Sequence, residues 1–287
     1  GSFESLVGEV DFGLRSSAAL VVPDEVQLRW FDYWLKGTDN GVMDEPAIQA
    51  FVMGRNEWRG MEHWPAAAKR TPLFLRSGGA ANSLSGDGRL SREAPGEEPA
   101  DTFVYDPRRP VPTRGGGLCC HASSLPAGAF DQHAVEQRSD VLVYSTPPLE
   151  RDLEVIGPVE LHLWVSSTAR DTDFTAKLVD VEPCGFARNL TDGILRARFR
   201  DGHGRAAPLE PNRPVELVVD LGVTCNVFRA GHSVRLEVSS SNFPRFDRNP
   251  NTGRSPAQET LLRPALQTVW HDADHPSHLA LPVVGGG

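Results

Sequence analysis

The stretch Val159-Glu160-Leu161-His162-Leu163-Trp164-Val165 decides the fold, because aliphatic side chains occupy every second position along it. A period of two is typical of a β-strand with one buried face and one face in water. The same alternation recurs at Val215–Val219 and Val234–Val238. Together with further candidate strands, this predicts about nine strands joined by Gly- and Pro-rich connections, as in a two-sheet sandwich. The further strands are predicted at 73–76, 102–105, 141–145, 174–181, 195–200 and 279–284.

Composition agrees with a mainly β globular chain and excludes several functions. The 287 residues include 27 Gly and 23 Pro, which argues against a helix-dominated fold. A formal charge of −9 argues against binding of nucleic acid, which requires a positively charged surface. No apolar run reaches the roughly 18 residues that a membrane helix requires, so we expect no membrane partner. The four cysteines form no C-x-x-C pair and the chain opens without a signal-peptide pattern, which predicts a cytoplasmic protein with reduced thiols.

The first seventy residues follow a different pattern. Pro23 and Asp24 open a segment with an apolar face that includes Trp30 and Trp34, and Lys36-Gly37 closes it as a helix end. A strand is predicted at 48–53, a turn at 56–59 and a connector at 65–70. Residues 77–96 are interpreted as a loop.

Candidate chemical motifs are few, and each has a structural alternative. The nucleophile elbow G-x-S-x-G is absent, and its nearest match, Gly231–Arg235, opens a predicted strand. No phosphate- or dinucleotide-binding glycine motif is present, so no cofactor is expected. Asp171 and Asp173 are expected to form hydrogen bonds at a strand start, and the polar run 245–252 to pin the two sheets together. A cluster near the end of the chain could hold a metal or form a polar turn, and the turn is favoured: His271, Asp272, Asp274, His275 and His278.

Several longer motifs resemble the family of serine hydrolases that contains cocaine esterase and X-Pro dipeptidyl-peptidase, of the CocE/NonD type. The resemblance covers the chain from about Phe12 to Val284. It is carried by the segments 51–54, 57–59, 102–107, 140–146, 172–181, 239–248, 251–253 and 275–278.

The resemblance implies three parts: an α/β-hydrolase domain, a helical cap and a C-terminal jelly-roll β-sandwich, galactose-binding-like in fold. Residues 1–70 then resemble the C-terminal end of the hydrolase domain, an α/β remnant, and residues 71–287 resemble the sandwich. None of the nine histidines follows the family's Gly-Pro-Trp motif, so the chain is expected to begin after the catalytic histidine and to lack the Ser-Asp-His triad. The upstream hydrolase and cap domains are the implied partners.

The resemblance also implies one segment close to the active site. The loop after the Asp-Pro…Pro-Val-Pro run lends apolar side chains to the acyl pocket in the family. Here it is Gly115-Gly116-Gly117-Leu118-Cys119-Cys120, so Leu118, Cys119 and Cys120 are candidate lining residues for a small ester, amide or peptide substrate. Glycines allow close backbone approach. Both cysteines could equally be small core hydrophobes.

Two other functions remain open. A stand-alone jelly-roll could bind carbohydrate through Trp164 and Trp270, since aromatic rings stack on sugars, although buried tryptophans are commoner. A purely structural sandwich could buttress the hydrolase or form a homo-oligomer. In either case the helix around Trp30 and Trp34 would expose an apolar patch, which predicts self-association of the chain made alone.

Overall fold

A computed structural model describes residues 4–17, 20, 23–66, 68–118, 123–202, 204–254 and 257–285. Eleven strands join in one hydrogen-bonded sheet, which confirms the predicted mainly β sandwich. They are β5 (Ala68–Arg76), β6 (Arg89–Ser91), β7 (Asp101–Tyr105), β8 (Leu142–Ser145), β9 (Leu153–Ser167), β10 (Asp173–Val181), β11 (Ala187–Arg196), β12 (Val215–Phe228), β13 (Ser233–Ser239), β14 (Ala265–Trp270) and β15 (His278–Val284).

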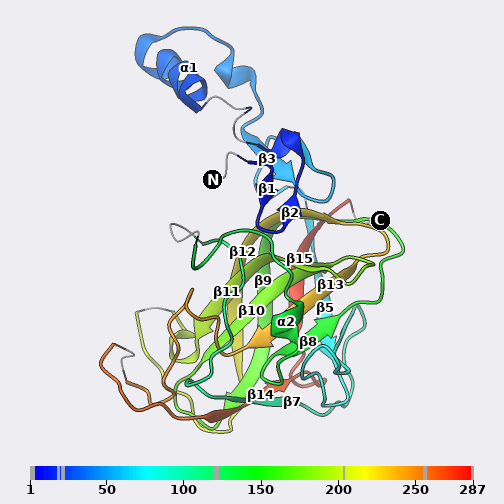
Figure 1. The fold of residues 1–287 in the computed structure, drawn as a ribbon, viewed down its shortest axis with the longest axis vertical. Helices are drawn as coiled ribbons and strands as arrows, with labels where there is room; N and C mark the ends of the chain where they lie inside the picture. The colour runs from blue at the N-terminus through cyan, green and yellow to red at the C-terminus, as the bar shows by residue number, and fades with distance from the viewer. Residues whose placement is uncertain are drawn as a thin grey trace.

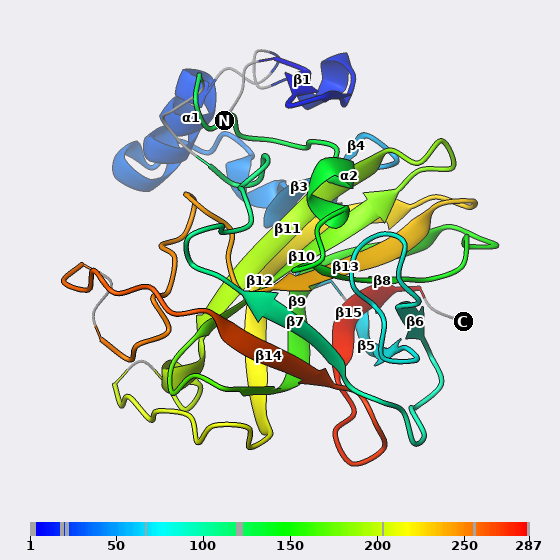
Figure 2. The same cartoon turned by 60° about the horizontal axis from the view of Figure 1, so that its bottom comes forward.

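The sheet folds round into two layers (Figure 1, Figure 2). The order β11-β10-β13-β8 forms one layer, and β5-β15-β9 forms the other with β12, β14 and β7. The short strand β6 connects them, pairing antiparallel with β5 and parallel with β8. At the far side β11 meets β12 so closely that a Cβ on Gly193 would lie 2.0 Å from the carbonyl oxygen of Asp220.

The core lies between the layers and is built from the inward residues of the alternating strands. Tyr105, Tyr144, Phe174 and Phe228 are its largest fully buried side chains. The period-two rule fails at β10, where all nine residues are buried. The long β7–β8 connection, with the short helix α2 (His133–Glu136), covers the outer face of this strand, so both faces are dry.

The chain enters the sandwich through a hairpin that packs on it. Strands β3 (Ile48–Val52) and β4 (Glu57–Met61) pair with each other, and Met53 exchanges backbone hydrogen bonds with Cys225 and Val227 of β12 at 3.0 and 2.8 Å. The predicted turn at 56–59 is right only at Asn56, because residues 57–61 form β4. The turn comes earlier, at left-handed Gly54 and Asn56, with φ of 82° and 54°.

Helix α1 (Pro23–Lys36) has the predicted bounds and is followed by left-handed Gly37. It projects away from the sandwich (Figure 1), and none of its residues is buried. Trp30 and Trp34 are 47% and 56% exposed, and their rings contact each other in a tilted arrangement with centroids 5.8 Å apart. Short elements flank it: β1 (Leu6–Val7), β2 (Val10–Asp11), η1 (Leu14–Ser16) and η3 (Val42–Asp44).

Other local expectations differ from the structure. The strand predicted at 195–200 ends at Arg196, where the 3₁₀ turn η4 (Ala197–Phe199) begins and the Ala197 N–H bonds to the Thr172 carbonyl at 2.9 Å. The interpreted loop 77–96 contains β6, and β14 was not predicted. In the described part of the chain, no helix has the length and apolar character to cross a membrane.

Candidate functional site

The loop predicted to line a pocket is described as far as Leu118, which is half-buried; Cys119 and Cys120 lie outside the described residues. Gly115 and Gly116 take left-handed φ values of 68° and 96°, which only glycine adopts without strain. Gly116 exchanges two backbone hydrogen bonds with Gly128, at 2.7 and 3.0 Å. The loop is therefore pinned to the segment that follows it.

A partly buried ion pair lies directly beneath these glycines. Arg245 contacts Asp192 at 3.1 Å, and Asn242 donates to the same carboxylate at 2.9 Å. A Cβ at Gly116 would stand 3.0 Å from Arg245 Nη1, so the absence of a side chain lets the loop rest on the guanidinium. Burial raises the pKa of Asp192, although Arg245 and Lys177 oppose the shift.

Further charges lie between β10, β13 and helix α2. Lys177 Nζ is 3.1 Å from Glu237 and 3.1 Å from Gln132 Oε1, and all three side chains are buried. Arg235 pairs with buried Glu136 at 2.6 Å. Burial and the neighbouring Glu237 raise the pKa of Glu136 to about 7, against the opposing effect of Arg235. The charged side chains described in this layer are paired with one another.

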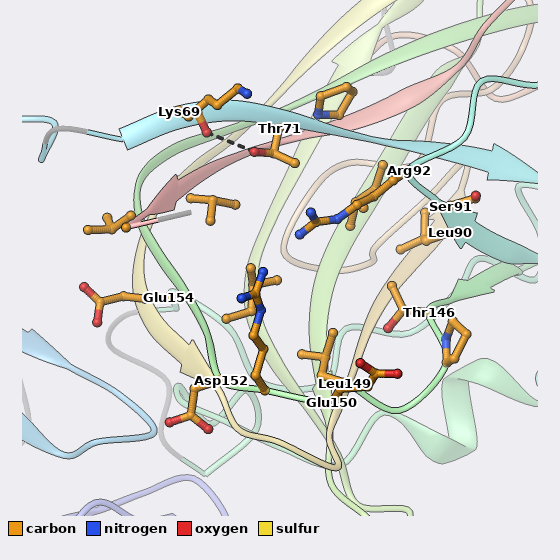
Figure 3. A pocket seen from close by; sticks show the side chains of 18 of the residues that line it. Lys69, Thr71, Leu90, Ser91, Arg92, Thr146, Leu149, Glu150, Asp152 and Glu154 are labelled. Carbon is orange, nitrogen blue, oxygen red and sulfur yellow. Dashed lines mark hydrogen bonds between the residues drawn. The ribbon is translucent and has the colours of Figure 1, made fainter. Parts of the chain in front are cut away.

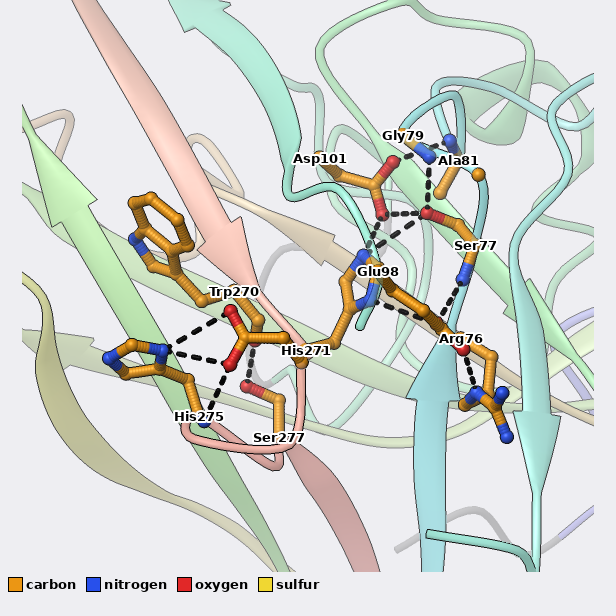
Figure 4. Close-up of polar contacts among 12 residues, drawn as sticks. Arg76, Ser77, Gly79, Ala81, Glu98, Asp101, Trp270, His271, His275 and Ser277 are labelled. Atoms are coloured by element: carbon orange, nitrogen blue, oxygen red, sulfur yellow. Dashed lines mark hydrogen bonds and ion pairs between the residues drawn. The ribbon is translucent and has the colours of Figure 1, made fainter. Parts of the chain in front are cut away.

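A second cluster places a serine, a histidine and carboxylates together (Figure 4). Ser77 Oγ is 3.1 Å from His271 Nε2, and His271 Nδ1 is 3.4 Å from Glu98 Oε2. Asp101 Oδ2 lies 2.9 Å from the same Nε2. Ser77 directly follows β5, Asp101 begins β7 and His271 directly follows β14, while Glu98 lies in the β6–β7 connection.

Hydrogen bonding shows that this cluster is not a catalytic triad. Ser77 Oγ donates to Asp101 at 2.7 Å and accepts from the Gly79 N–H at 3.0 Å, so its proton is not directed at the imidazole. A catalytic base would need a free lone pair facing the serine. His271 and Asp101 are fully buried, so no acyl group can approach. The cluster ties the strand ends together.

Asp101 receives four hydrogen bonds in that cluster. Besides Ser77 and His271, Tyr144 OH donates to Oδ2 at 2.8 Å and the Ala81 N–H to Oδ1 at 2.8 Å. Burial alone would raise the pKa of Asp101, but these bonds outweigh it and hold the pKa below its ordinary value. The carboxylate is therefore the charged centre of the cluster.

The remaining residues near the C-terminus do not gather round one point. His271 faces the core cluster, His275 bonds to Asp272 at 3.0 Å, and His278 stacks on His162 with ring centroids 4.5 Å apart. Among the described residues, no group of three or more His, Cys, Asp or Glu side chains could hold a metal ion. The polar-turn interpretation fits this arrangement.

The predicted pinning of the sheets is present in the loop after β13. Asn249 donates to Asp171 at 3.2 Å and to Asp173 at 2.8 Å, and Tyr105 OH donates to its carbonyl at 3.0 Å. Arg196 and Arg198 supply the positive charge at these carboxylates, at 2.8 and 3.4 Å. The positive charge that a bound calcium ion would supply to these carboxylates therefore comes from arginine side chains.

A cavity of about 750 Å³ lies between the β5–β6 wall and the β8–β9 connection (Figure 3), and it was not predicted from the sequence. The available signal was the shortness of the apolar pattern at Arg89-Leu90-Ser91, which leaves β6 far shorter than its neighbour β5.

These observations define a β-sandwich domain whose described buried ionisable groups bond to one another and serve the fold. Residues 40–280 match the family described as the X-Pro dipeptidyl-peptidase C-terminal non-catalytic domain. The chain belongs to this family, found in hydrolases of the CocE/NonD type, and the predicted membership is confirmed.

Comparison with individual proteins gives the same result. The chain is 42% identical to cocaine esterase from Rhodococcus sp. (strain MB1 Bresler) over 95% of its own length and 48% of that protein. Two solved structures are similar: an aminopeptidase from a Thaumarchaeota archaeon (TM-score 0.82, 27% identity, 98% of this chain, 46% of that one) and an alpha-amino acid ester hydrolase (TM-score 0.75, 30% identity, 89% and 44%). The chain thus spans about half the length of these relatives.

Proposed function

We propose that the chain is the C-terminal part of a serine hydrolase that cleaves small esters, amides or N-terminal X-Pro dipeptides. Residues 1–70 would be the end of its α/β-hydrolase domain and residues 71–287 its jelly-roll domain. The observation that carries this proposal is helix α1, which is apolar along much of its length yet buries no residue. An amphipathic helix of this kind normally packs its apolar face on another element. Relatives about twice as long, named as an esterase, an aminopeptidase and an ester hydrolase, support an upstream domain in that place.

In this proposal the reaction takes place on upstream residues. A serine hydroxyl attacks the substrate carbonyl, a histidine removes its proton, and backbone donors stabilise the oxyanion. Leu118, Cys119 and Cys120 would form part of the acyl-pocket wall. Support comes from the left-handed glycines and from Arg245, which fix the loop from below. No cofactor is required. Cys184 and Cys225 are free thiols, which supports a cytoplasmic location.

Reconstitution tests the proposal. The chain is produced alone and joined to the upstream half of its polypeptide, and both are assayed with a p-nitrophenyl ester and an alanyl-proline anilide. We expect turnover only in the joined protein. A folded joined protein that hydrolyses neither substrate class would contradict the assignment, as would equal turnover by the chain alone.

The pocket wall is tested in the joined protein. Leu118→Ala should extend the accepted acyl chain and raise kcat/KM for longer esters relative to acetate, because it removes volume from the wall. Leu266→Ala provides the control, since Leu266 is a solvent-accessible leucine that lies on β14 and not in this loop. An unchanged chain-length preference in Leu118→Ala would remove this loop from the pocket.

A second function is favoured by one observation. Trp164 and Trp270 are paired on neighbouring strands β9 and β14, and His275 contacts both rings at centroid distances of 5.1 and 5.6 Å. Such a half-exposed aromatic group could stack on a sugar. Saturable binding on a glycan array, abolished by Trp164→Ala, would support a carbohydrate-binding module, and a blank array would refute it.

A further inference from the structure

The cavity of about 750 Å³ is a gap in the sheet one strand wide. Strand β6 lies between β8 and β5 in the sheet order, but it has three residues whereas β5 has nine. After Ser91 the chain turns away, as the Glu93 N–H bonds to Ser91 Oγ at 3.0 Å. Since neighbouring strands lie about 4.8 Å apart, the vacated position is roughly 10 Å wide between its two walls.

The β5 wall has an unpaired backbone edge. The Leu75 N–H bonds to Ser277 at 3.0 Å, so residues 75, 73 and 71 direct their backbone groups at β15. Residues 74, 72 and 70 then direct theirs at the β6 side, because an antiparallel strand alternates. β6 pairs only with residues 74–76. Within the described residues, no strand pairs with the edge at Arg70 and Pro72.

Proline limits what can pair there. Pro72 has no N–H to donate at its edge position, and Pro147 has none on the opposite wall. Proline at an edge protects a sheet from pairing with another long strand. The available backbone groups are the N–H and C=O of Arg70 and the carbonyl of Pro72. The gap is therefore better suited to pairing with a short extended peptide than with the sheet of a second copy of the chain.

The charges of the two walls favour an anion. On the far wall Asp152 is held by Arg229 at 3.1 Å, and Glu154 by Arg59. Among the described residues, Arg92 and Lys69 have no carboxylate partner. Figure 3 shows the Arg92 side chain directed into the middle of the gap. Glu150 is the remaining acid of the lining and offsets one of these two cations.

The cavity floor is apolar. Leu149 and Leu153 are partly buried and pack against the main core, and Leu73, Leu90 and Val283 also line the gap. A strand placed here would turn every second side chain toward this floor and the others toward solvent and the cations.

We propose that this gap binds a short extended peptide in which apolar and acidic residues alternate. Its backbone pairs with Arg70, its apolar side chains cover Leu149 and Leu153, and its carboxylates contact Arg92 and Lys69. This mode of recognition is strand addition, in which backbone bonds give affinity and alternate side chains give selectivity. The proposal does not depend on the proposed hydrolase.

Fluorescence anisotropy of labelled pentapeptides on the 287-residue chain tests it. A peptide of alternating aspartate and valine should bind saturably, and the lysine–valine version should bind at least about tenfold more weakly, a factor that corresponds to 1.4 kcal/mol. N-methylation of the central amides should abolish binding, because it removes the strand-pairing donors. Salt should weaken binding.

Variants locate the site. Arg92→Glu and Lys69→Glu should each weaken binding of the acidic peptide by about tenfold. Arg109 is an exposed arginine outside the lining, and Arg109→Glu should leave the affinity unchanged. The proposal is overturned if the acidic peptide does not bind saturably up to millimolar concentration or if the lysine peptide binds equally well. It is also overturned if Arg109→Glu loses as much affinity as the two variants of the lining. Displacement of the peptide by octanoate at equal concentration would instead show a site for small carboxylates and would overturn strand addition.

Discussion

Asp101→Asn should destabilise the chain strongly, because it changes the acceptor at the centre of the Ser77–His271 cluster. Three donors, from Ser77, Tyr144 and His271, converge on Oδ2. Asparagine can keep its oxygen for the Ala81 N–H, but its amide nitrogen then faces those donors. His271 can change tautomer and accept, whereas the fully buried Tyr144 hydroxyl loses its acceptor.

The magnitude follows from these contacts. Loss of one hydrogen bond to a charged group and one buried unsatisfied hydroxyl together cost about 3–5 kcal/mol. At about 2 °C per kcal/mol for a chain of this size, Tm falls by about 6–10 °C at pH 7. Because the pKa of Asp101 is held below its ordinary 3.8, the carboxylate's contribution persists above that pH and is lost as the pH falls through the lowered pKa. The difference between wild type and variant should therefore narrow only below about pH 4.

Calorimetry and guanidinium titration at pH 7 measure this effect. Asp39→Asn is the matched control, since Asp39 is an exposed aspartate in the segment after α1, and it should change Tm little. If Asp101→Asn and Asp39→Asn unfold within 1 °C of each other (about 0.5 kcal/mol), the carboxylate does not hold the cluster together.

Three further outcomes are expected. Glu136→Gln should flatten the pH dependence of stability: the folded chain keeps this proton up to pH about 7, the unfolded chain releases it near 4.5, and wild type therefore loses at most about 3 kcal/mol across that range. Gly193→Ala should cost about 1–3 kcal/mol in guanidinium titration, because its Cβ would meet the Asp220 carbonyl. Trp30→Ser combined with Trp34→Ser should lower self-association of the isolated chain in light scattering without changing Tm, since neither ring is buried.

Control variants separate these specific effects on stability and association from the effect of any substitution. Gly96→Ala adds a Cβ in open space and should be neutral. Val223→Ser removes an exposed apolar side chain from β12, outside α1, and should leave light scattering unchanged. An unchanged pH slope in Glu136→Gln would show that another group titrates there, and persistent aggregation of the double tryptophan variant would show that another surface drives association.

The sequence predicted elements wherever local chemistry decides them. Helix α1 has its expected ends because Pro23 suits the first turn of a helix and Gly37 adopts a left-handed cap. The alternating strands around Leu161, Leu217 and Leu236 follow from burial of one face. Family motifs added the assignment to a non-catalytic domain, which periodicity alone could not supply.

Features that depend on distant contacts were not predicted. The strand β10 was expected at 174–181, but the burial of both its faces was not. β10 has polar residues such as Lys177 on a face that looks wet in sequence, but the β7–β8 connection covers it and Glu237 and Gln132 satisfy the ammonium. His271 could not be separated from His275 by spacing, because its partners Ser77 and Asp101 are almost two hundred residues away. The gap beside β6 depends on strand order, which local patterns do not encode.

The paired charges on the outer face of β10 fix the position of the loop that carries Gly116. The pairs Lys177–Glu237 and Arg245–Asp192 bridge neighbouring strands or loops of one layer, so the surface they form is held by the sheet itself. Gln132 then donates to the carbonyl of Arg114 at 2.9 Å, and Gly116 sits on Arg245. The loop 115–118 rests on side chains whose charges are already paired, so it needs no ion pair of its own. Its glycines let its backbone lie close to the Arg245 guanidinium. In the proposed hydrolase, the sandwich would therefore position one wall of the acyl pocket, and the reacting residues would lie in the upstream domain.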